Sequence, residues 1–251
     1  MSDFISSNEM WVFVLVFSRI GSAVSVLPLF GSQAVPMRVR LAIALVLSYV
    51  LTWTLSIHDT PDVTRIDLFD IVSEMLIGLA LGLFVRLILI SIQMAGTMAA
   101  QSTSLSQVFG TASSEPMPAL GHLFTYGSVA MLAAVGFHLE IIDYLNQFYQ
   151  VVPMTSEIPI ADFAEWIIGV VQLCFELAFV LALPFFSISL LYNVSIGFIN
   201  KAMPQLMVAF VGAPLITLMS LALMALLTPV IFTLWHSNLS SLLSNPTESL
   251  F

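Results

Sequence analysis

Six long apolar stretches dominate this sequence and leave few folds open to it. They span about 10–30, 39–57, 68–100, 119–150, 163–199 and 206–236. One bilayer crossing takes about 20 apolar residues, and in lipid only helices and closed barrels satisfy the whole backbone. The chain has 251 residues, of which 59% are hydrophobic and 8% charged, and it lacks the short alternating strands of a barrel. The sequence therefore predicts an all-α membrane protein with about six long, kinked helices.

Charge is scarce and mostly negative. The formal net charge is −9, which is the wrong sign for a nucleic-acid partner or for an anionic membrane surface. Among the basic residues of the loops, Arg38, Arg40 and Lys201 fall on one side of the predicted spans and Arg65 on the other. The positive-inside rule then places both termini away from the cytoplasm.

Several apolar stretches do not fit ordinary bilayer crossings. The stretch 68–100 would form a helix of about 50 Å at 1.5 Å per residue, whereas the hydrocarbon core is about 30 Å thick. Others are interrupted by proline, which removes a backbone donor and bends a helix; these prolines are Pro28, Pro184, Pro214 and Pro229. We therefore expect the helices to pack against other protein over much of their length.

Six ionisable residues lie inside the apolar stretches. They are Arg19, Glu74, Arg86, Glu140, Asp143 and Glu176. A charge at the centre of a bilayer costs about 2.5–3.5 kcal/mol on insertion scales, so each residue needs a partner or a cavity. Ion pairs between helices, contacts with other subunits and a proton or ion relay all remain open.

The spacing of these residues narrows the pairs that can form. Arg19 and Arg86 are opposite in charge to Glu74 and Glu176, but Glu74 and Arg86 lie about 18 Å apart along one straight helix and cannot pair there. Glu140 and Asp143 are one helical turn apart, which suits a hydrated rim.

The third apolar stretch contains a helix-packing motif, and the loop that follows it has an unusual composition. Gly78 and Gly82 form a GxxxG face for close helix contact, within the chain or between chains. The loop 101–118 is rich in Ser, Thr and Gln, has one charged residue, Glu115, and also carries bulky side chains. It reads either as a plain solvent loop or as a gate folded into a protein-lined lumen. Its candidate gate residues are Leu105, Gln107, Val108, Phe109 and Met117.

No catalytic or cofactor motif is recognisable. The four histidines are scattered without metal-ligand spacing, and P-loop, HExxH, GxSxG and dinucleotide-binding patterns are missing from the sequence. We expect neither enzyme activity nor a cofactor or metal. A secondary transporter for a small solute, built from broken helices and midplane charges, is a competing hypothesis. A membrane-embedded enzyme is a weaker one.

Three blocks of sequence together resemble a known family. The first begins Arg19-Ile-Gly-Ser and continues through Leu27-Pro-Leu-Phe-Gly; the second is Glu74-Met-Leu-Ile-Gly-Leu-Ala-Leu-Gly with Gln93-Met-Ala-Gly; the third contains Met203-Pro204-Gln205. In this order they are similar to the FliR-like export-gate family of flagellar and injectisome type III secretion. Lys201 stands where the family usually has Arg, and Ser102 replaces a glycine.

The resemblance implies an architecture. FliR-like proteins join FliP and FliQ subunits in a closed helical cone within the flagellar basal body of the bacterial inner membrane, much of it on the periplasmic side. This chain would be one helical subunit, with a FliP-like half over about 1–160 and a FliQ-like hairpin over about 161–251. An FlhB-like subunit would be a further partner.

The resemblance also implies roles. Such a subunit helps to form the pore that admits unfolded flagellar proteins, and its plug loop, at about 105–118 here, closes the lumen. The buried charges would contact neighbouring subunits, and Lys201, Pro204 and Gln205 would form the family-motif loop. An injectisome subunit is the alternative within the same family.

Overall fold

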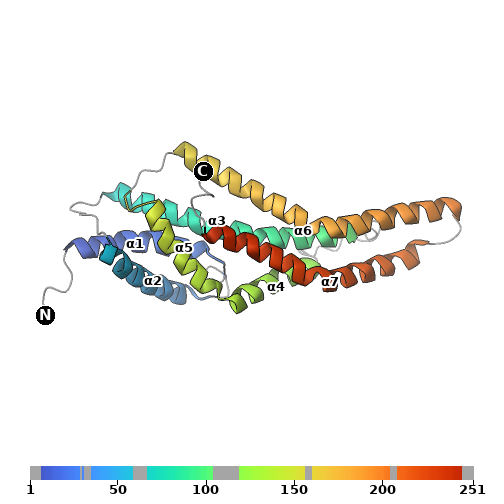
Figure 1. Cartoon of the computed structure of the whole chain (residues 1–251), viewed down its shortest axis with the longest axis horizontal. Coiled ribbons are helices and arrows are strands. Elements are labelled where there is room, and N and C mark those ends of the chain that lie inside the picture. The colour runs from blue at the N-terminus through green and yellow to red at the C-terminus, as the bar shows by residue number, and fades with distance from the viewer. Residues whose placement is uncertain are drawn as a thin grey trace. The chain divides into compact units, whose positions relative to one another are not determined.

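The computed structural model describes residues 7–28, 30, 35–58, 67–103, 119–155, 160–203 and 208–244, and these ranges contain seven helices and no strand (Figure 1). The helices are α1 (Ser7–Val26), α2 (Met37–His58), α3 (Leu68–Thr103), α4 (Ala119–Val135), α5 (Phe137–Val151), α6 (Ile160–Ala202) and α7 (Val208–Ser244). The prediction of an all-α fold is confirmed.

Local chemistry explains where two of the helices begin. Asp67 precedes α3, and its backbone N–H donates to Asp70 Oδ2 at 2.9 Å, while the Asp70 N–H donates back to the Asp67 carbonyl at 3.1 Å. This reciprocal pair satisfies donors that the first helical turn leaves open. Pro36 precedes α2, and its carbonyl accepts from the N–H groups of Val39 and Arg40.

The structure differs from the sequence prediction in the fourth apolar stretch. Instead of one long helix, residues 119–150 form two helices, α4 and α5, with a break between them. Gly136 lies at the break with φ 86°. That left-handed conformation carries little steric cost for glycine and interrupts the helix. Apolar composition alone runs unbroken across the break and therefore gave no sign of it.

Four helices of the described ranges are long and apolar enough to cross a membrane, or five if the pair α4–α5 counts as one span. The sequence suggested six. The difference arises from α4–α5 and from α1, whose apolar part, Met10–Val26, falls below the length of a span. The helices α3 and α6 are overlong, with candidate spans of 35 and 40 residues.

The chain divides into two compact units, and several helices contribute to both. The first unit contains α1, α2, α5, α3 up to Ile88, α6 up to Val171 and the end of α7. Its core contains an aromatic cluster, in which the Phe84 ring centroid lies 6.1 Å from that of Tyr144 and 5.6 Å from that of Trp166. These contacts join α3, α5 and α6.

The second unit contains α4 and the remaining parts of α3, α6 and α7. Phe124 of α4 is at its centre, with its ring centroid 6.2 Å from Phe185 of α6 and 6.0 Å from Phe232 of α7. Gly127 lets α4 approach α7 closely, because a Cβ there would lie 2.7 Å from the Phe232 ring.

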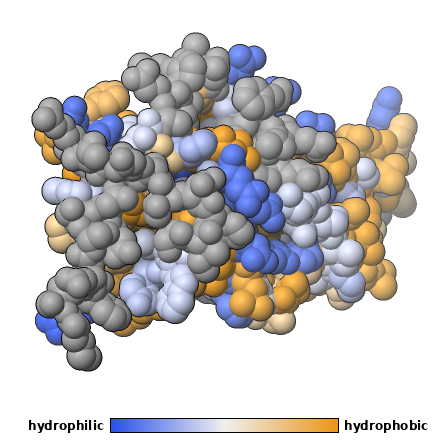
Figure 2. Space-filling view, turned by 60° about the vertical axis from the view of Figure 1, so that its left-hand side comes forward, coloured by the Kyte–Doolittle hydropathy of each residue, from blue (hydrophilic) through white to orange (hydrophobic). Residues whose placement is uncertain are grey.

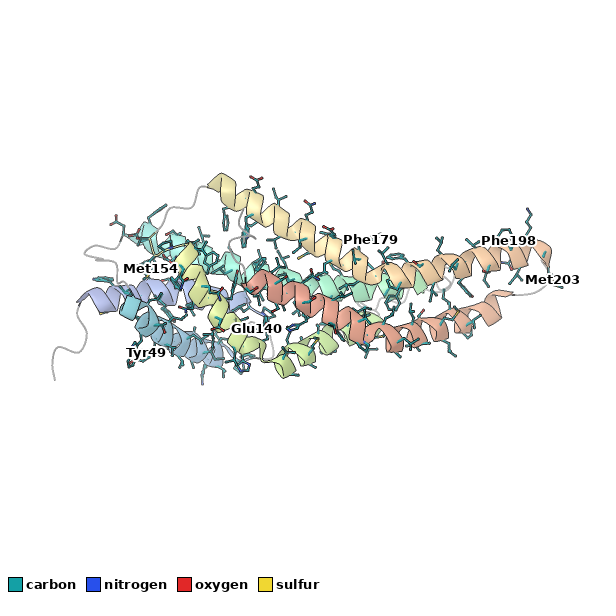
Figure 3. All side chains as sticks on the ribbon, viewed as in Figure 1. Tyr49, Glu140, Met154, Phe179, Phe198 and Met203 are labelled. Atoms are coloured by element: carbon teal, nitrogen blue, oxygen red, sulfur yellow. The ribbon has the colours of Figure 1, made fainter. Side chains whose placement is uncertain are left out.

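Large apolar side chains remain at the surface of both units. Figure 2 shows apolar residues interspersed with hydrophilic ones on the face that it draws. Tyr49, Phe179, Phe198 and Met203 are each more than half exposed and are labelled in Figure 3. An apolar surface of this extent marks contact with lipid or with other proteins.

Candidate functional site

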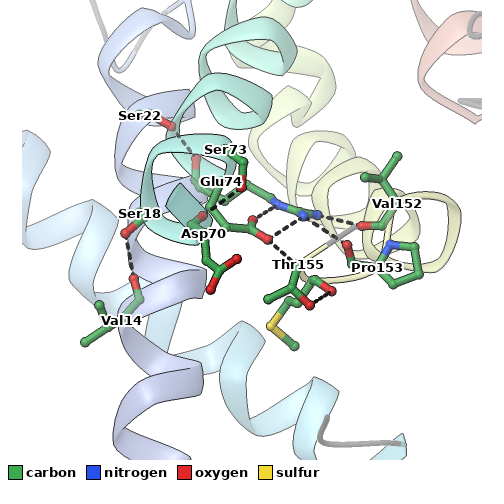
Figure 4. A network of polar contacts seen from close by, with 11 residues as sticks. Val14, Ser18, Ser22, Asp70, Ser73, Glu74, Val152, Pro153 and Thr155 are labelled. Atoms are coloured by element: carbon green, nitrogen blue, oxygen red, sulfur yellow. Dashed lines mark hydrogen bonds and ion pairs between the residues drawn. The ribbon is translucent and has the colours of Figure 1, made fainter. Parts of the chain in front are cut away.

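A buried ion pair between Arg19 of α1 and Glu74 of α3 is the best-defined polar centre of the first unit (Figure 4). Both residues have 0% exposure. Arg19 Nε lies 2.5 Å from Glu74 Oε2, and Arg19 Nη2 lies 3.0 Å from Glu74 Oε1. This bidentate geometry matches the planar guanidinium to the carboxylate and fixes both side chains.

The end of α5 completes the centre. Arg19 Nη1 donates to the Val152 carbonyl at 2.8 Å and Nη2 to the Pro153 carbonyl at 3.4 Å, while the Thr155 N–H donates to Glu74 Oε1 at 3.0 Å. Thr155 has φ 61°, a left-handed conformation that is unusual for a β-branched residue. The hydrogen bond to Glu74 helps to hold this backbone, so the ion pair also shapes the chain after α5.

Tyr149 of α5 adds an aromatic face to the centre. The Arg19 Cζ lies 4.3 Å from the Tyr149 ring centroid, which is a cation–π contact. The Tyr149 hydroxyl is buried and has no hydrogen-bond partner among the described residues. Three helices thus meet at Arg19.

Two glycines bring α3 against α1 at the same level. A Cβ on Gly78 would lie 1.9 Å from the Arg19 carbonyl oxygen, and one on Gly82 would lie 2.6 Å from the Ala23 carbonyl oxygen. Such distances exclude any side chain unless the helices separate. The Gly78–Gly82 face is therefore used within this chain, which resolves the alternative that the sequence left open.

The chemistry of this centre is that of a structural clamp. Four hydrogen bonds from the guanidinium and three to the carboxylate satisfy both charges. The resemblance implied contacts between subunits for these residues, but Arg19 and Glu74 meet each other within the chain. A pair so completely enclosed holds helices together, because removing either partner would leave a buried charge.

The other predicted charges are not part of this centre. Arg86 and Glu176 are exposed on α3 and α6. Asp143 is exposed and Glu140 half-buried on α5, and both line a small pocket of about 140 Å³ together with residues of the end of α7. Glu140 Oε2 is buried and has no hydrogen-bond partner among the described residues. The described ranges contain no group of three or more His, Cys, Asp or Glu that could hold a metal.

The hydrogen bond between a serine hydroxyl of α6 and the end of α3 was not predicted from the sequence. In the second unit, Ser189 of α6 donates to the Ser102 carbonyl, and the Asn193 side-chain amide donates to the Ser189 carbonyl at 2.8 Å. Ser102 and Ser189 are both buried. This contact fixes the last turn of α3, immediately before the predicted gate loop.

Several predicted site residues lie outside the described residues. These are Leu105, Gln107, Val108, Phe109, Met117, Pro204 and Gln205. Lys201 is exposed in the last turn of α6. The backbone partners Val152, Pro153 and Thr155 were missed because a carbonyl or an N–H leaves no signature in sequence.

Comparison with known proteins decides the family. Residues 10–242 match the family described as bacterial export proteins, family 1. The chain belongs to this family. It is 28% identical to the flagellar biosynthetic protein FliR of Caulobacter vibrioides over 249 residues, which cover 97% of this chain and 98% of the relative.

Two further relatives of this chain also carry the name flagellar biosynthetic protein FliR. The protein of Escherichia coli strain K12 is 27% identical over 85% of this chain and 82% of its own length. The protein of Bacillus subtilis strain 168 is 28% identical over 88% of this chain and 87% of its own length. The likeness therefore extends over nearly the whole chain in distant bacteria.

Proposed function

We propose that this chain is a core subunit of a flagellar type III secretion export gate. It assembles with FliP-like and FliQ-like subunits, and with an FlhB-like subunit, into the pore that admits unfolded flagellar proteins. The observation that carries this proposal is the match of residues 10–242 to a bacterial export family, together with the flagellar names of the relatives. Those names favour the flagellar system over the injectisome.

The surface of the structure supports an assembled state. Arg86 and Glu176 are exposed charges within long apolar helices, where exposure to lipid carries a substantial cost. Contact with other chains removes that cost. In this proposal the gate lies in the bacterial inner membrane at the flagellar basal body, with much of it on the periplasmic side. The chain forms part of the pore and part of the element that closes it, and it performs no enzymatic step.

In this proposal, successive parts of the chain have different roles in the gate. The part up to about residue 160 takes a FliP-like position in the ring, and the part from about 161 supplies a FliQ-like helical hairpin. The loop around 105–118 closes the lumen. Its neutral polar residues suit a path for chains of arbitrary sequence, and its bulky apolar residues Val108 and Phe109 suit a seal.

Co-purification tests the assembly. The tagged full-length chain, expressed with the FliP-like and FliQ-like chains of the same genome, should bring both with it from detergent-solubilised membranes. Recovery of the tagged chain alone, with a well-behaved monomer that binds a metabolite, would favour a solute transporter instead.

Deletion of residues 106–116 tests the closure. We expect the complex to assemble and its ion conductance in a planar bilayer to rise, because the seal is removed. A matched variant keeps the length of the loop but replaces Val108 and Phe109 with Ser, and it should leak less than the deletion. Unchanged conductance in both variants would contradict the plug assignment.

A further inference from the structure

One face of α3 in the first unit carries a narrow exposed stripe. Its positions follow the 3–4 spacing of a helix that packs along a single neighbour. We name this stripe the α3 seam; its members are Phe69, Val72, Leu76, Leu79, Leu83 and Arg86. The five apolar members are between 39% and 71% exposed, with Phe69 at 71% and Leu76 at 56%.

Most of the rest of α3 in this unit is occupied, although Leu68 and Met75 are also exposed. Glu74 binds Arg19, Gly78 contacts the backbone of α1, and Phe84 packs against aromatic rings of α5 and α6. Leu81 and Val85, on the same side as these residues, are each 1% exposed. The seam is therefore a stripe of about one third of the helix circumference, since successive residues of an α-helix turn by about 100°. One additional helix would cover it.

Arg86 distinguishes the α3 seam from an ordinary lipid-facing surface. It is exposed and has neither an ion-pair nor a hydrogen-bond partner among the described residues. It lies 12 positions after Glu74, which is itself fully engaged by Arg19 and Thr155. A guanidinium at the end of an apolar stripe is favourable when a carboxylate meets it, because the pair is then bidentate and shielded from water.

We propose that the α3 seam binds an apolar helix of a different chain, and that this helix carries an Asp or Glu at the level of Arg86. The proposal rests on the proposed function, in that the export gate is the assembly that supplies the helix. A symmetric contact with a second copy is disfavoured because the seam itself contains no acidic residue: it would bring two basic stripes together without a carboxylate.

Charge reversal tests the pairing. In the co-expressed complex, Arg86→Glu should lower the yield of co-purified partner by at least about tenfold, because it opposes two like charges in a desolvated contact. Arg86→Lys keeps the charge but loses the bidentate fork, so its yield should lie between those of the wild type and Arg86→Glu. Arg38→Glu is the matched control, since Arg38 is also an exposed arginine of this unit but lies outside the seam; it should leave the yield unchanged. A wild-type yield for Arg86→Glu would overturn the proposal.

Photo-crosslinking gives a second test that needs no disruptive substitution. A photoreactive phenylalanine analogue at Leu76 or Leu83, in the assembled complex, should form an adduct with a different protein chain, and mass spectrometry should place that adduct near an acidic residue. Adducts only with lipid, or only with a second copy of this chain, would overturn the proposal. If the wild-type chain fails to co-purify any partner, the proposed function itself has failed, which is a separate result.

Discussion

The two faces of α3 in the first unit differ in how their charged residue is paired. On the buried face, Glu74 is satisfied by Arg19 and by the Thr155 N–H. On the exposed face, Arg86 ends an apolar stripe and has no partner among the described residues. Both residues belong to one uninterrupted helix, so hydropathy alone assigns them the same environment.

The comparison teaches that an intramembrane charge has to be judged by its partners. A saturated pair stabilises one chain, whereas an exposed single charge indicates a contact that the chain does not complete by itself. The buried face should therefore govern the stability of the isolated chain, and the α3 seam should govern assembly. Three pairs of substitutions test this division, from the largest expected effect to the smallest.

Glu74→Ala should have the largest effect. It leaves the Arg19 guanidinium buried without its carboxylate, and breaking a buried pair in this way costs about 3–5 kcal/mol. The melting temperature of the detergent-solubilised chain should fall sharply. Arg86→Ala is the comparison on the exposed face, and it should melt close to wild type. Equal melting temperatures for the two variants would remove the distinction between the faces.

Two leucines, one on the buried face of α3 and one on the exposed face, test the same division without changing a charge. Leu81 is 1% exposed and Leu83 is 39% exposed. Leu81→Ala should destabilise the isolated chain by about 2–5 kcal/mol, because it leaves a cavity. Leu83→Ala leaves no enclosed cavity and should change the stability by less than about 0.5 kcal/mol. Denaturation monitored by circular dichroism compares them; a larger loss for Leu83→Ala would mean that the burial pattern is wrong.

Gly78→Ala should have a smaller but measurable effect. Its Cβ would meet the Arg19 carbonyl oxygen at 1.9 Å, so α1 must move away, at about 1–3 kcal/mol for overpacking. The matched control is Gly169→Ala in α6, where a Cβ meets nothing within 4 Å and higher helix propensity should be neutral or stabilising. Melting curves of both variants give the answer, and a stabilised Gly78→Ala variant would contradict the close packing of α1 on α3.

The sequence predicts the fold class well because helix length and apolar composition are properties of each segment. It misses the break at Gly136 because apolar residues continue on both sides and a glycine alone does not determine φ. It singles out Arg19 and Glu74, but their pairing depends on how α1 and α3 pack. The contributions of Val152, Pro153 and Thr155 come from backbone groups, which every residue carries.

The central claim is that this chain is one component of a larger gate. Native mass spectrometry of the complex extracted in mild detergent tests it most directly. The account predicts a single assembly, much heavier than the 27.4 kDa chain, that releases this chain together with FliP-like and FliQ-like chains on activation. A stable, folded species with the mass of this chain alone, from membranes that contain all three proteins, would contradict it.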